Sequence, residues 1–312
     1  MAWLEITVNT QGRETESVAA VLTAAGFSDL VVEDQQEFET FLDQNRAYWD
    51  YIDEDLQQQL QGLSQIKLYL EDSDTAGLAR LNEIIQTQQL SIETSTLPET
   101  DWEESWKDNY PAVEVGKNFV VLPYWLADSD DCGRLPVILD PGLTFGTGAH
   151  PSTQMVMEFM EEAVQPGSVC LDLGSGSGIL SIAALRLGAK SAIGVDIDPK
   201  AEDIARENAA YNHCGSPEFT ALTGNVTTDR PLMDRLSKER YDVVLVNIVA
   251  DVIIGLAPVL PAFLTENSIL ICSGILHDRL GDVTSALEHA GLTVTATRAK
   301  EDWRSITAKR RT

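Results

Sequence analysis

The architecture of this chain follows from one stretch, Val169-Cys170-Leu171-Asp172-Leu173-Gly174-Ser175-Gly176-Ser177-Gly178. An apolar run ends at an acid, three glycines follow at alternate positions, and a helical pattern continues from Ile179 to Leu187. This order predicts a buried strand, a tight turn and a helix N-terminus. Glycine is needed where the backbone takes positive φ or where a ligand touches the main chain. The free N–H groups at a helix N-terminus favour a polar or anionic ligand.

The glycine spacing narrows the class of ligand. A dinucleotide fingerprint, G-x-G-x-x-G, would need glycine at position 179, which is Ile179. The spacing G-x-G-x-G, with Asp172 two residues before the first glycine, resembles the first motif of class I S-adenosylmethionine-dependent methyltransferases. A second acid, Asp196, ends a short apolar strand about 20 residues later, where a carboxylate can accept hydrogen bonds from both ribose hydroxyls. We therefore expect a nucleoside site; a glycine-rich turn without any ligand is the alternative.

Length and composition set further limits. The chain has 312 residues, enough for two globular domains. No apolar stretch approaches the roughly 18 residues of a membrane-spanning helix, so we expect no membrane association. The opening residues Met1 to Ile6 lack the basic region and apolar core of a signal peptide. The cysteines are far apart, which predicts reduced thiols in a cytoplasmic protein and no metal site; they are Cys132, Cys170, Cys214 and Cys272.

The charge is strongly and unevenly acidic. The formal net charge is −27, and the first hundred residues hold 19 acidic against 4 basic side chains. Such a surface repels phosphates, so we expect no direct binding of nucleic acid. Attraction to a basic partner is one explanation of this charge, and general solubility is the other.

Residues 1–95 predict a small domain of alternating strands and helices. Strands are expected at 3–8, 30–32, 48–52, 66–70 and 90–96, and helices at 14–25 and 75–88. This order suggests a ferredoxin-like α+β sandwich. It contains no catalytic cluster, so its predicted task is recognition of the substrate. Residues 96–112 predict a linker with a short helix, Trp102 to Asn109, whose Trp102 and Trp106 would dock on a neighbour.

Residues 113–312 predict the second domain, an α/β fold. Paired strands at 119–122 and 137–139 lead into a loop rich in glycine and proline. Seven further strands are expected at 169–173, 193–196, 219–222, 241–247, 268–272, 292–296 and 305–308, and helices at 153–164, 179–187, 199–211, 251–264 and 277–290. Parallel strands need helices on both faces, which is a doubly wound sheet. Asp172, Asp196 and Asn247 each end a strand and should surround one crevice.

The loop makes a more specific resemblance possible. It reads Asp140-Pro141-Gly142-Leu143-Thr144-Phe145-Gly146-Thr147-Gly148-Ala149-His150-Pro151-Ser152-Thr153, and it precedes the glycine motif and Asn247-Ile248-Val249-Ala250-Asp251. Together these motifs are similar to the ribosomal protein L-eleven (L11) methyltransferase family, over essentially the whole chain. The resemblance implies S-adenosyl-L-methionine as cofactor, and methylation of lysine side chains and the α-amine of L11. It also implies an N-terminal domain that binds this basic substrate. We expect the chain to act as a monomer.

The resemblance also assigns site residues. It implies that the cofactor is contacted by Thr153, Gly174, Asp196 and Asn247, with Asp172 and Gly176 in the same pocket, and that Phe145, Gly146, Thr147 and Gly148 cover it. Ala149, Ser175 and Val249 depart from the commoner threonine, cysteine and leucine, which leaves the chemistry intact. Plain structural roles are the alternatives: Ser152 or Asn247 as helix caps, and Asp196 as a solvated acid.

Asn247 is the predicted catalytic residue. Methyl transfer from a sulfonium requires a neutral amine, and lysine has an ordinary pKa near 10.4. The amide oxygen of Asn247 can accept an N–H bond while the nitrogen lone pair faces the methyl group. An uncharged amide at this position, unlike a carboxylate, does not stabilise the protonated, unreactive form of the amine. Asp172 is expected to order the glycine turn or to meet the cofactor's ammonium group. His150 is expected to be structural and is left out of catalysis.

Two other functions are compatible with the pattern. One is a small-molecule methyltransferase with an accessory domain, and the other is a non-catalytic interaction protein that retains a nucleoside pocket. The resemblance disfavours a glutamine methyltransferase. In that class the asparagine is followed by Pro-Pro-Tyr, whereas Asn247 is followed by Ile248-Val249.

Overall fold

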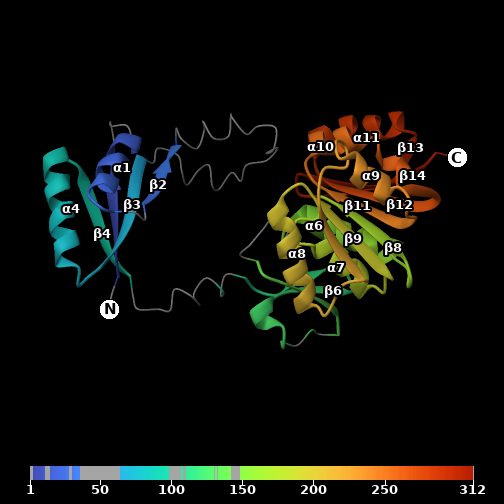
Figure 1. Cartoon of the computed structure of the whole chain (residues 1–312), viewed down its shortest axis with the longest axis horizontal. Coiled ribbons are helices and arrows are strands. Elements are labelled where there is room, and N and C mark those ends of the chain that lie inside the picture. Colours follow the sequence, from blue (N-terminus) through green and yellow to red (C-terminus); the bar gives the residue numbers. More distant parts are fainter. Residues whose placement is uncertain are drawn as a thin grey trace. The chain divides into compact units, whose positions relative to one another are not determined.

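The computed structural model describes residues 3–10, 15–27, 30–35, 64–97, 107, 110–129, 131, 133–141 and 148–311. The chain divides into two compact units, Met1–Asn109 and Tyr110–Thr312 (Figure 1). Several sequence predictions lie outside the described residues or nearly so, among them the strand at 48–52, the short helix at 102–109, of which only residue 107 is described, and Cys132. Among the described residues, no helix is long and apolar enough to cross a membrane.

The described part of the first unit is an antiparallel sheet with its two helices on one face. Its elements are β1 (Trp3–Asn9), α1 (Thr15–Ala24), β2 (Leu30–Asp34), β3 (Ser64–Glu71), α4 (Thr75–Gln88) and β4 (Ser91–Leu97), and the strand order is β2-β3-β1-β4. Alternate residues of β1, Ile6 and Val8, are buried and pack with Leu22 of α1 and Leu81 of α4. Because residues 36–63 lie between β2 and β3 and are not described, the ferredoxin-like assignment stays a prediction.

The second unit contains the seven-stranded sheet that the sequence predicts. Its strands are β8 (Val169–Leu173), β9 (Ser191–Asp196), β10 (Phe219–Thr223), β11 (Tyr241–Asn247), β12 (Leu264–Leu276), β13 (Leu292–Lys300) and β14 (Trp303–Arg310). They lie in the order β10-β9-β8-β11-β12-β14-β13. Neighbours are parallel, except that β14 is antiparallel to both β12 and β13. The strand order changes direction at β8, which is the position where α/β sheets bind ligands.

Helices cover both faces of this sheet (Figure 1). Successive side chains of a strand point to opposite faces. Accordingly, Val243 and Leu245 pack with α6 (Pro151–Ala163), α7 (Ile179–Arg186) and α8 (Pro199–Tyr211). Val244 and Val246 belong to the other core, with α9 (Arg230–Leu236), α10 (Ala250–Leu256) and α11 (Leu280–His289). Two apolar layers on one strand require two layers of helices, so the doubly wound prediction is confirmed.

A small second sheet accompanies the large one. It consists of β5 (Val113–Val115), β6 (Phe119–Pro123) and β7 (Leu135–Leu139) in that order. The predicted pairing of the last two strands is confirmed, and they run parallel. A short 3-10 helix, η2 (Tyr124–Leu126), lies on the connection between them.

Three predicted elements of the second unit have clearly wrong boundaries. The helix expected over residues 251–264 ends at Leu256 and is followed by a separate 3-10 turn, η3 (Leu260–Ala262). Pro258 and Pro261 lack the N–H that would continue it. The next strand, β12, is longer than predicted and begins at Leu264. The helix expected from residue 277 begins as a 3-10 turn, η4 (His277–Arg279), before α11. Helix α9 and strand β5 were not predicted.

Candidate functional site

Three strand ends lie level at one edge of the sheet. Leu173 of β8 pairs with Val195 of β9 and with Val246 of β11. The next residue on each strand is therefore at the same height: Gly174, Asp196 and Asn247. The structure thus brings these predicted residues together at the carboxyl edge, with Asp172 two residues below Gly174.

The buried acid Asp172 holds the start of α7. Its Oδ2 accepts hydrogen bonds from the Ser181 backbone N–H at 3.2 Å and the Ser181 hydroxyl at 2.9 Å. Its Oδ1 is buried and has no hydrogen-bond partner among the described residues. Burial raises the pKa of Asp172 to about 7, although the two bonds from Ser181 lower it. An acceptor that is buried and unpaired costs free energy until a donor reaches it, so Oδ1 fits a ligand's ammonium group.

Asp196 orders the glycine turn as well as ending its strand. One carboxylate oxygen accepts from the Gly176 N–H at 2.8 Å, and the other accepts from the Asp198 N–H at 3.0 Å. The side chain is half-buried rather than freely solvated. Each oxygen has further lone pairs, so the carboxylate can also accept from ribose hydroxyls.

Gly174 allows a close packing contact beside the site. It has φ of +76°, and a Cβ at this position would lie 2.5 Å from Cγ2 of Ile248, the residue after Asn247. A larger residue would therefore push the Asn247 segment away from the glycine turn. On the opposite side of this segment, Gly274 has φ of +81°, and its Cβ would lie 2.5 Å from the Ile248 carbonyl oxygen.

These two glycines hold Ile248 between them, which the sequence analysis missed. The pairing of β12 with β14 shifts register between Cys272 and Ile275, so Gly274 lies in a bulge. The Ile248 N–H donates to the Ser273 carbonyl at 3.2 Å. The signal in the sequence was a glycine in the interior of an apolar strand, which often marks a bulge or a close backbone approach.

Asn247 is joined to Thr153 of α6. Its Nδ2 donates to the Thr153 hydroxyl at 3.1 Å, and Thr153 is fully buried. Its Oδ1 accepts no hydrogen bond from the described residues. The alternative role of Asn247 as a helix cap is wrong, because α10 begins at Ala250 with Val249 as its cap residue.

The cap of α6 differs from the expected one. His150, rather than Ser152, occupies the cap position, and its Nδ1 accepts from the Ser152 N–H at 3.2 Å. The ring also makes an edge contact with Trp303, at 4.7 Å between centroids. Burial lowers the pKa of His150, and the nearby Glu301 opposes this. The imidazole of His150 therefore caps the N-terminus of α6.

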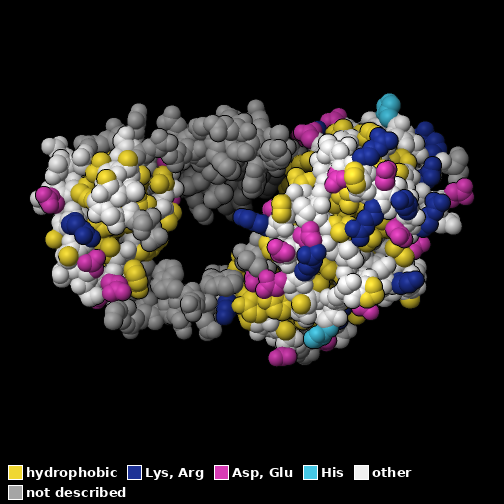
Figure 2. Space-filling view, viewed as in Figure 1, with side chains coloured by type: hydrophobic (Ala, Val, Ile, Leu, Met, Phe, Trp, Pro, Cys, Tyr) yellow, Lys and Arg dark blue, Asp and Glu magenta, His cyan; other side chains and the backbone are white. Residues whose placement is uncertain are grey.

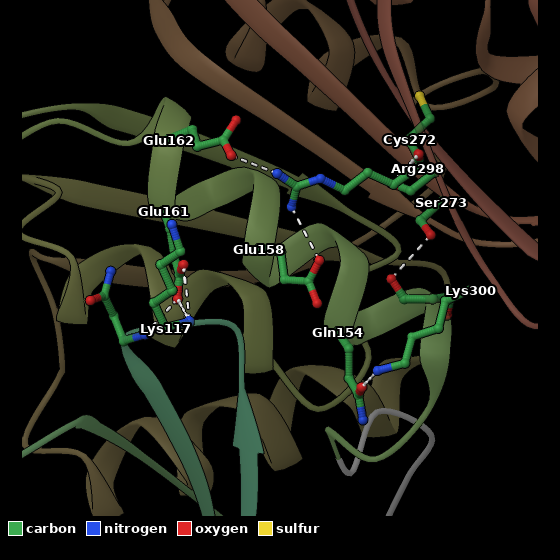
Figure 3. Close-up of polar contacts among 12 residues, drawn as sticks. Lys117, Gln154, Glu158, Glu161, Glu162, Cys272, Ser273, Arg298 and Lys300 are labelled. Atoms are coloured by element: carbon green, nitrogen blue, oxygen red, sulfur yellow. Dashed lines mark hydrogen bonds and ion pairs between the residues drawn. The ribbon is translucent and has the colours of Figure 1, made fainter. Parts of the chain in front are cut away.

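Several contacts hold α6, the helix that carries Thr153, and Figure 3 shows them. Arg298 of β13 pairs with Glu158 at 3.2 Å and with Glu162 at 2.6 Å. Lys300, on the same strand, donates to Gln154. At the site end of the helix, the Ser273 hydroxyl donates to the Ser152 carbonyl at 3.0 Å. The first turn of α6 is therefore tied to the bulge that also supports Ile248.

Little of the predicted covering loop is described. Phe145, Gly146 and Thr147 lie outside the described residues. Gly148 is buried with φ of +83°, and a Cβ there would lie 2.8 Å from the Val121 side chain. Packing against β6 is therefore enough to require glycine at this position. No group of side chains suited to a metal ion occurs in the described part of the chain.

The strand order, the glycine turn and the two strand-end acids define a class I methyltransferase fold. Comparisons with known proteins give the family: residues 2–311 match the family model described as ribosomal protein L11 methyltransferase. The chain belongs to this family. Its activity is therefore methyl transfer, and the predicted methyl donor, S-adenosyl-L-methionine, is confirmed.

Individual relatives match this chain over nearly the whole of their own length. The chain is 36% identical to a ribosomal protein L11 methyltransferase of Alkaliphilus oremlandii, covering 99% of both chains. It is 34% identical to one of Heliobacterium modesticaldum, covering 99% of this chain and 98% of the relative. A solved structure of a ribosomal protein L11 methylase from Lactobacillus delbrueckii subsp. bulgaricus is 29% identical, with a TM-score of 0.57, and it covers 65% of this chain and 100% of that one.

Proposed function

We propose that the chain transfers methyl groups from S-adenosyl-L-methionine to amino groups of ribosomal protein L11, namely lysine side chains and the N-terminal α-amine. The observation that carries the proposal is the amide of Asn247. It lies at the strand edge beside the glycine turn, its nitrogen donates to Thr153, and its oxygen accepts no hydrogen bond from the described residues. L11 is the substrate in the names of the relatives.

Residues of the strand edge are proposed to hold the cofactor. Asp196 would accept from the ribose hydroxyls, and Oδ1 of Asp172 would face the ammonium group. Gly174 and Gly176 would let the main chain approach the ligand, with Thr153 and Asn247 beyond them. From the sequence resemblance, Phe145 and Gly146 to Gly148 would cover the ligand. When bound, the cofactor supplies a methyl group made electrophilic by its sulfonium.

The chain's own part in the reaction is to orient a neutral amine. Oδ1 of Asn247 accepts one N–H of the amine, which directs the nitrogen lone pair away from the amide. Thr153 fixes which end of the amide faces the site, because its hydroxyl accepts from Nδ2. Positioning of this kind supplies an effective molarity of about 10⁵ M or more. No proton acceptor among the side chains is required, since the amine enters deprotonated.

Residues 1–95 are proposed to recognise the substrate, with residues 96–112 as a linker. The sheet face opposite α1 and α4 carries the odd-numbered residues of β1 and β3 and their neighbours on β2 and β4. Among them are Glu5, Glu33 and Glu93, against the single cation Lys67 on the described part of this face. In the view of Figure 2 the described part of the first unit shows more acidic than basic side chains, whereas the second unit shows both kinds interspersed. An acidic face suits a basic protein substrate.

Cysteine chemistry supports a reducing compartment. Cys170, Cys214 and Cys272 are free thiols in the structure, and burial raises the pKa of Cys170 to about 12. We therefore assign the chain to the cytoplasm, where it is proposed to act as a monomer.

Mass spectrometry of ribosomal proteins from cells with and without this chain tests the function. We expect methylated amines on L11 to disappear when the chain is absent. Unchanged L11 together with lost methylation of a small molecule would support the accessory-domain alternative instead. Transfer of label from the cofactor to purified L11 in vitro would show that the effect is direct.

A further inference from the structure

Two buried asparagines on α8 connect this helix to neighbouring backbone. Asn208 and Asn212 lie one turn apart, and their exposed fractions are 0% and 1%. The rest of the buried helix face is apolar, with Ala201, Ala205 and Ala209. A buried amide is destabilising unless both its oxygen and its nitrogen are hydrogen-bonded. Both asparagines meet this condition, but with different partners.

Asn212 bonds to β7 and to its own helix. Its Oδ1 accepts from the Ile138 N–H at 2.9 Å, and its Nδ2 donates to the Ile138 carbonyl at 2.6 Å. Nδ2 also donates to the carbonyl of Asn208 at 2.7 Å, and Arg186 donates to Oδ1 at 3.3 Å. None of these bonds involves the glycine turn.

Asn208 instead joins two separate elements. Its Nδ2 donates to the Ser177 carbonyl, inside the glycine turn, at 2.8 Å. Its Oδ1 accepts from the Asp140 N–H, just after the end of β7, also at 2.8 Å. One side chain therefore connects the turn to the small sheet through α8.

The closeness of α8 to the turn depends on Gly178. A Cβ at Gly178 would lie 3.0 Å from Cβ of Ala205, one turn before Asn208. Since two small residues meet here, the helix comes near enough for the Asn208 amide to reach Ser177. Ser177 is itself buried, at 3% exposed, so water cannot replace Asn208 as the donor to its carbonyl without rearrangement of the turn.

We propose that Asn208 is a positioning residue for cofactor binding. By holding the Ser177 carbonyl, it keeps the turn between Gly176 and Gly178 in the shape that presents its main chain to the ligand. This inference rests on the proposed function, in which the glycine turn contacts S-adenosyl-L-methionine. Asn208 itself touches neither the cofactor nor the amine.

The test compares Asn208→Ala with the matched control Asn212→Ala in the full chain. Calorimetry with S-adenosylhomocysteine measures the dissociation constant, and thermal unfolding measures stability. Both variants should lose stability, because each removes hydrogen bonds between a buried side-chain amide and the backbone. Only Asn208→Ala should weaken binding, by about tenfold, while Asn212→Ala stays within about twofold. Equal effects of the two variants on binding, or no effect of Asn208→Ala, would overturn the proposal.

A second variant, Asn208→Asp, carries the test if the alanine variant does not fold. A carboxylate still accepts from the Asp140 N–H but can donate to Ser177 only when protonated. Relative to the unmutated protein, its binding should be weakened when the carboxylate is charged, as measured at pH 8 and above. Binding equal to that of the unmutated protein at these pH values would contradict the role of the donor. If the unmutated protein bound no S-adenosylhomocysteine at all, the proposed function would fail; normal binding with insensitive variants would reject only the role of Asn208.

Discussion

The two sides of the sheet edge hold their residues in different ways. On the β8–β9 side, carboxylates of Asp172 and Asp196 accept bonds from the N–H groups and hydroxyl around the glycine turn. On the β11–β12 side, the neutral pair Asn247 and Thr153 is supported by the bulge at Gly274. The first arrangement suits a ligand that carries an ammonium group and hydroxyls. The second keeps negative charge away from an amine that must be neutral to react. Changes on the first side should therefore alter cofactor affinity, and changes on the second should alter turnover.

The largest effect is expected for Asn247→Ala. Loss of the group that orients the amine should lower kcat by about 100-fold, a larger change than the loss of affinity for S-adenosylhomocysteine, which Asn247 is also proposed to contact. Transfer of labelled methyl groups to purified L11 and calorimetry make the two measurements. A variant that lost turnover only because it no longer bound the cofactor would show that the two sides are not separate.

Gly274→Ala should reduce turnover by about tenfold, because its Cβ would displace the Ile248 backbone next to Asn247. The strained φ should also destabilise the fold by about 1–3 kcal/mol. Gly255→Ala in α10 is the control, since a Cβ there meets nothing within 4 Å. It should leave activity unchanged and slightly raise stability. Normal activity in Gly274→Ala would argue against the support of Asn247 by the bulge.

Asp172→Asn should change the pH dependence of stability in the protein without cofactor. Burial raises the pKa of Asp172 to about 7 from its ordinary 3.8. Between these values the folded chain holds a proton that the unfolded chain has released, so folding becomes less favourable as the pH rises. The free energy of unfolding of the variant, relative to that of the unmutated protein, should therefore rise between about pH 4 and pH 7. Above pH 7 the difference should stay constant.

Denaturant unfolding across this range measures the difference. Asp203→Asn, on the exposed surface of α8, makes the same change of charge away from the site and is the control. The Asp172 variant should also bind the cofactor more weakly, because an amide oxygen attracts an ammonium group less than a carboxylate does.

The smallest effect is expected for Glu93→Gln on the open face of the first unit. Removal of one charge should raise the KM for L11 by about twofold to threefold at low salt without changing kcat, and the difference should fade at high salt. Glu83→Gln on the exposed side of α4 removes the same charge from the helical face. Equal effects of the two substitutions would point to net charge rather than to a docking face.

The sequence predicted the large sheet because its strands are bounded by strong local signals. Alternating and continuous apolar runs end at Asp172, Asp196 and Asn247, and glycine or proline marks the turns. The same local signals could not predict the contact of Ile248 with Gly174 and Gly274, because it depends on how three separate segments approach in space. The cap at His150 was missed because serine is the more usual cap residue.

The central place of β11 in the sheet has a consequence for dynamics. Its backbone is paired with β8 on one side and β12 on the other, so the amide protons leading to Asn247 are released only when the whole sheet opens. Hydrogen exchange there should be as slow as global unfolding permits. The side chain proposed to orient the amine is thus carried by a strand that is paired on both sides, and a new methyl acceptor is more readily gained by altering the first unit than by redirecting this strand.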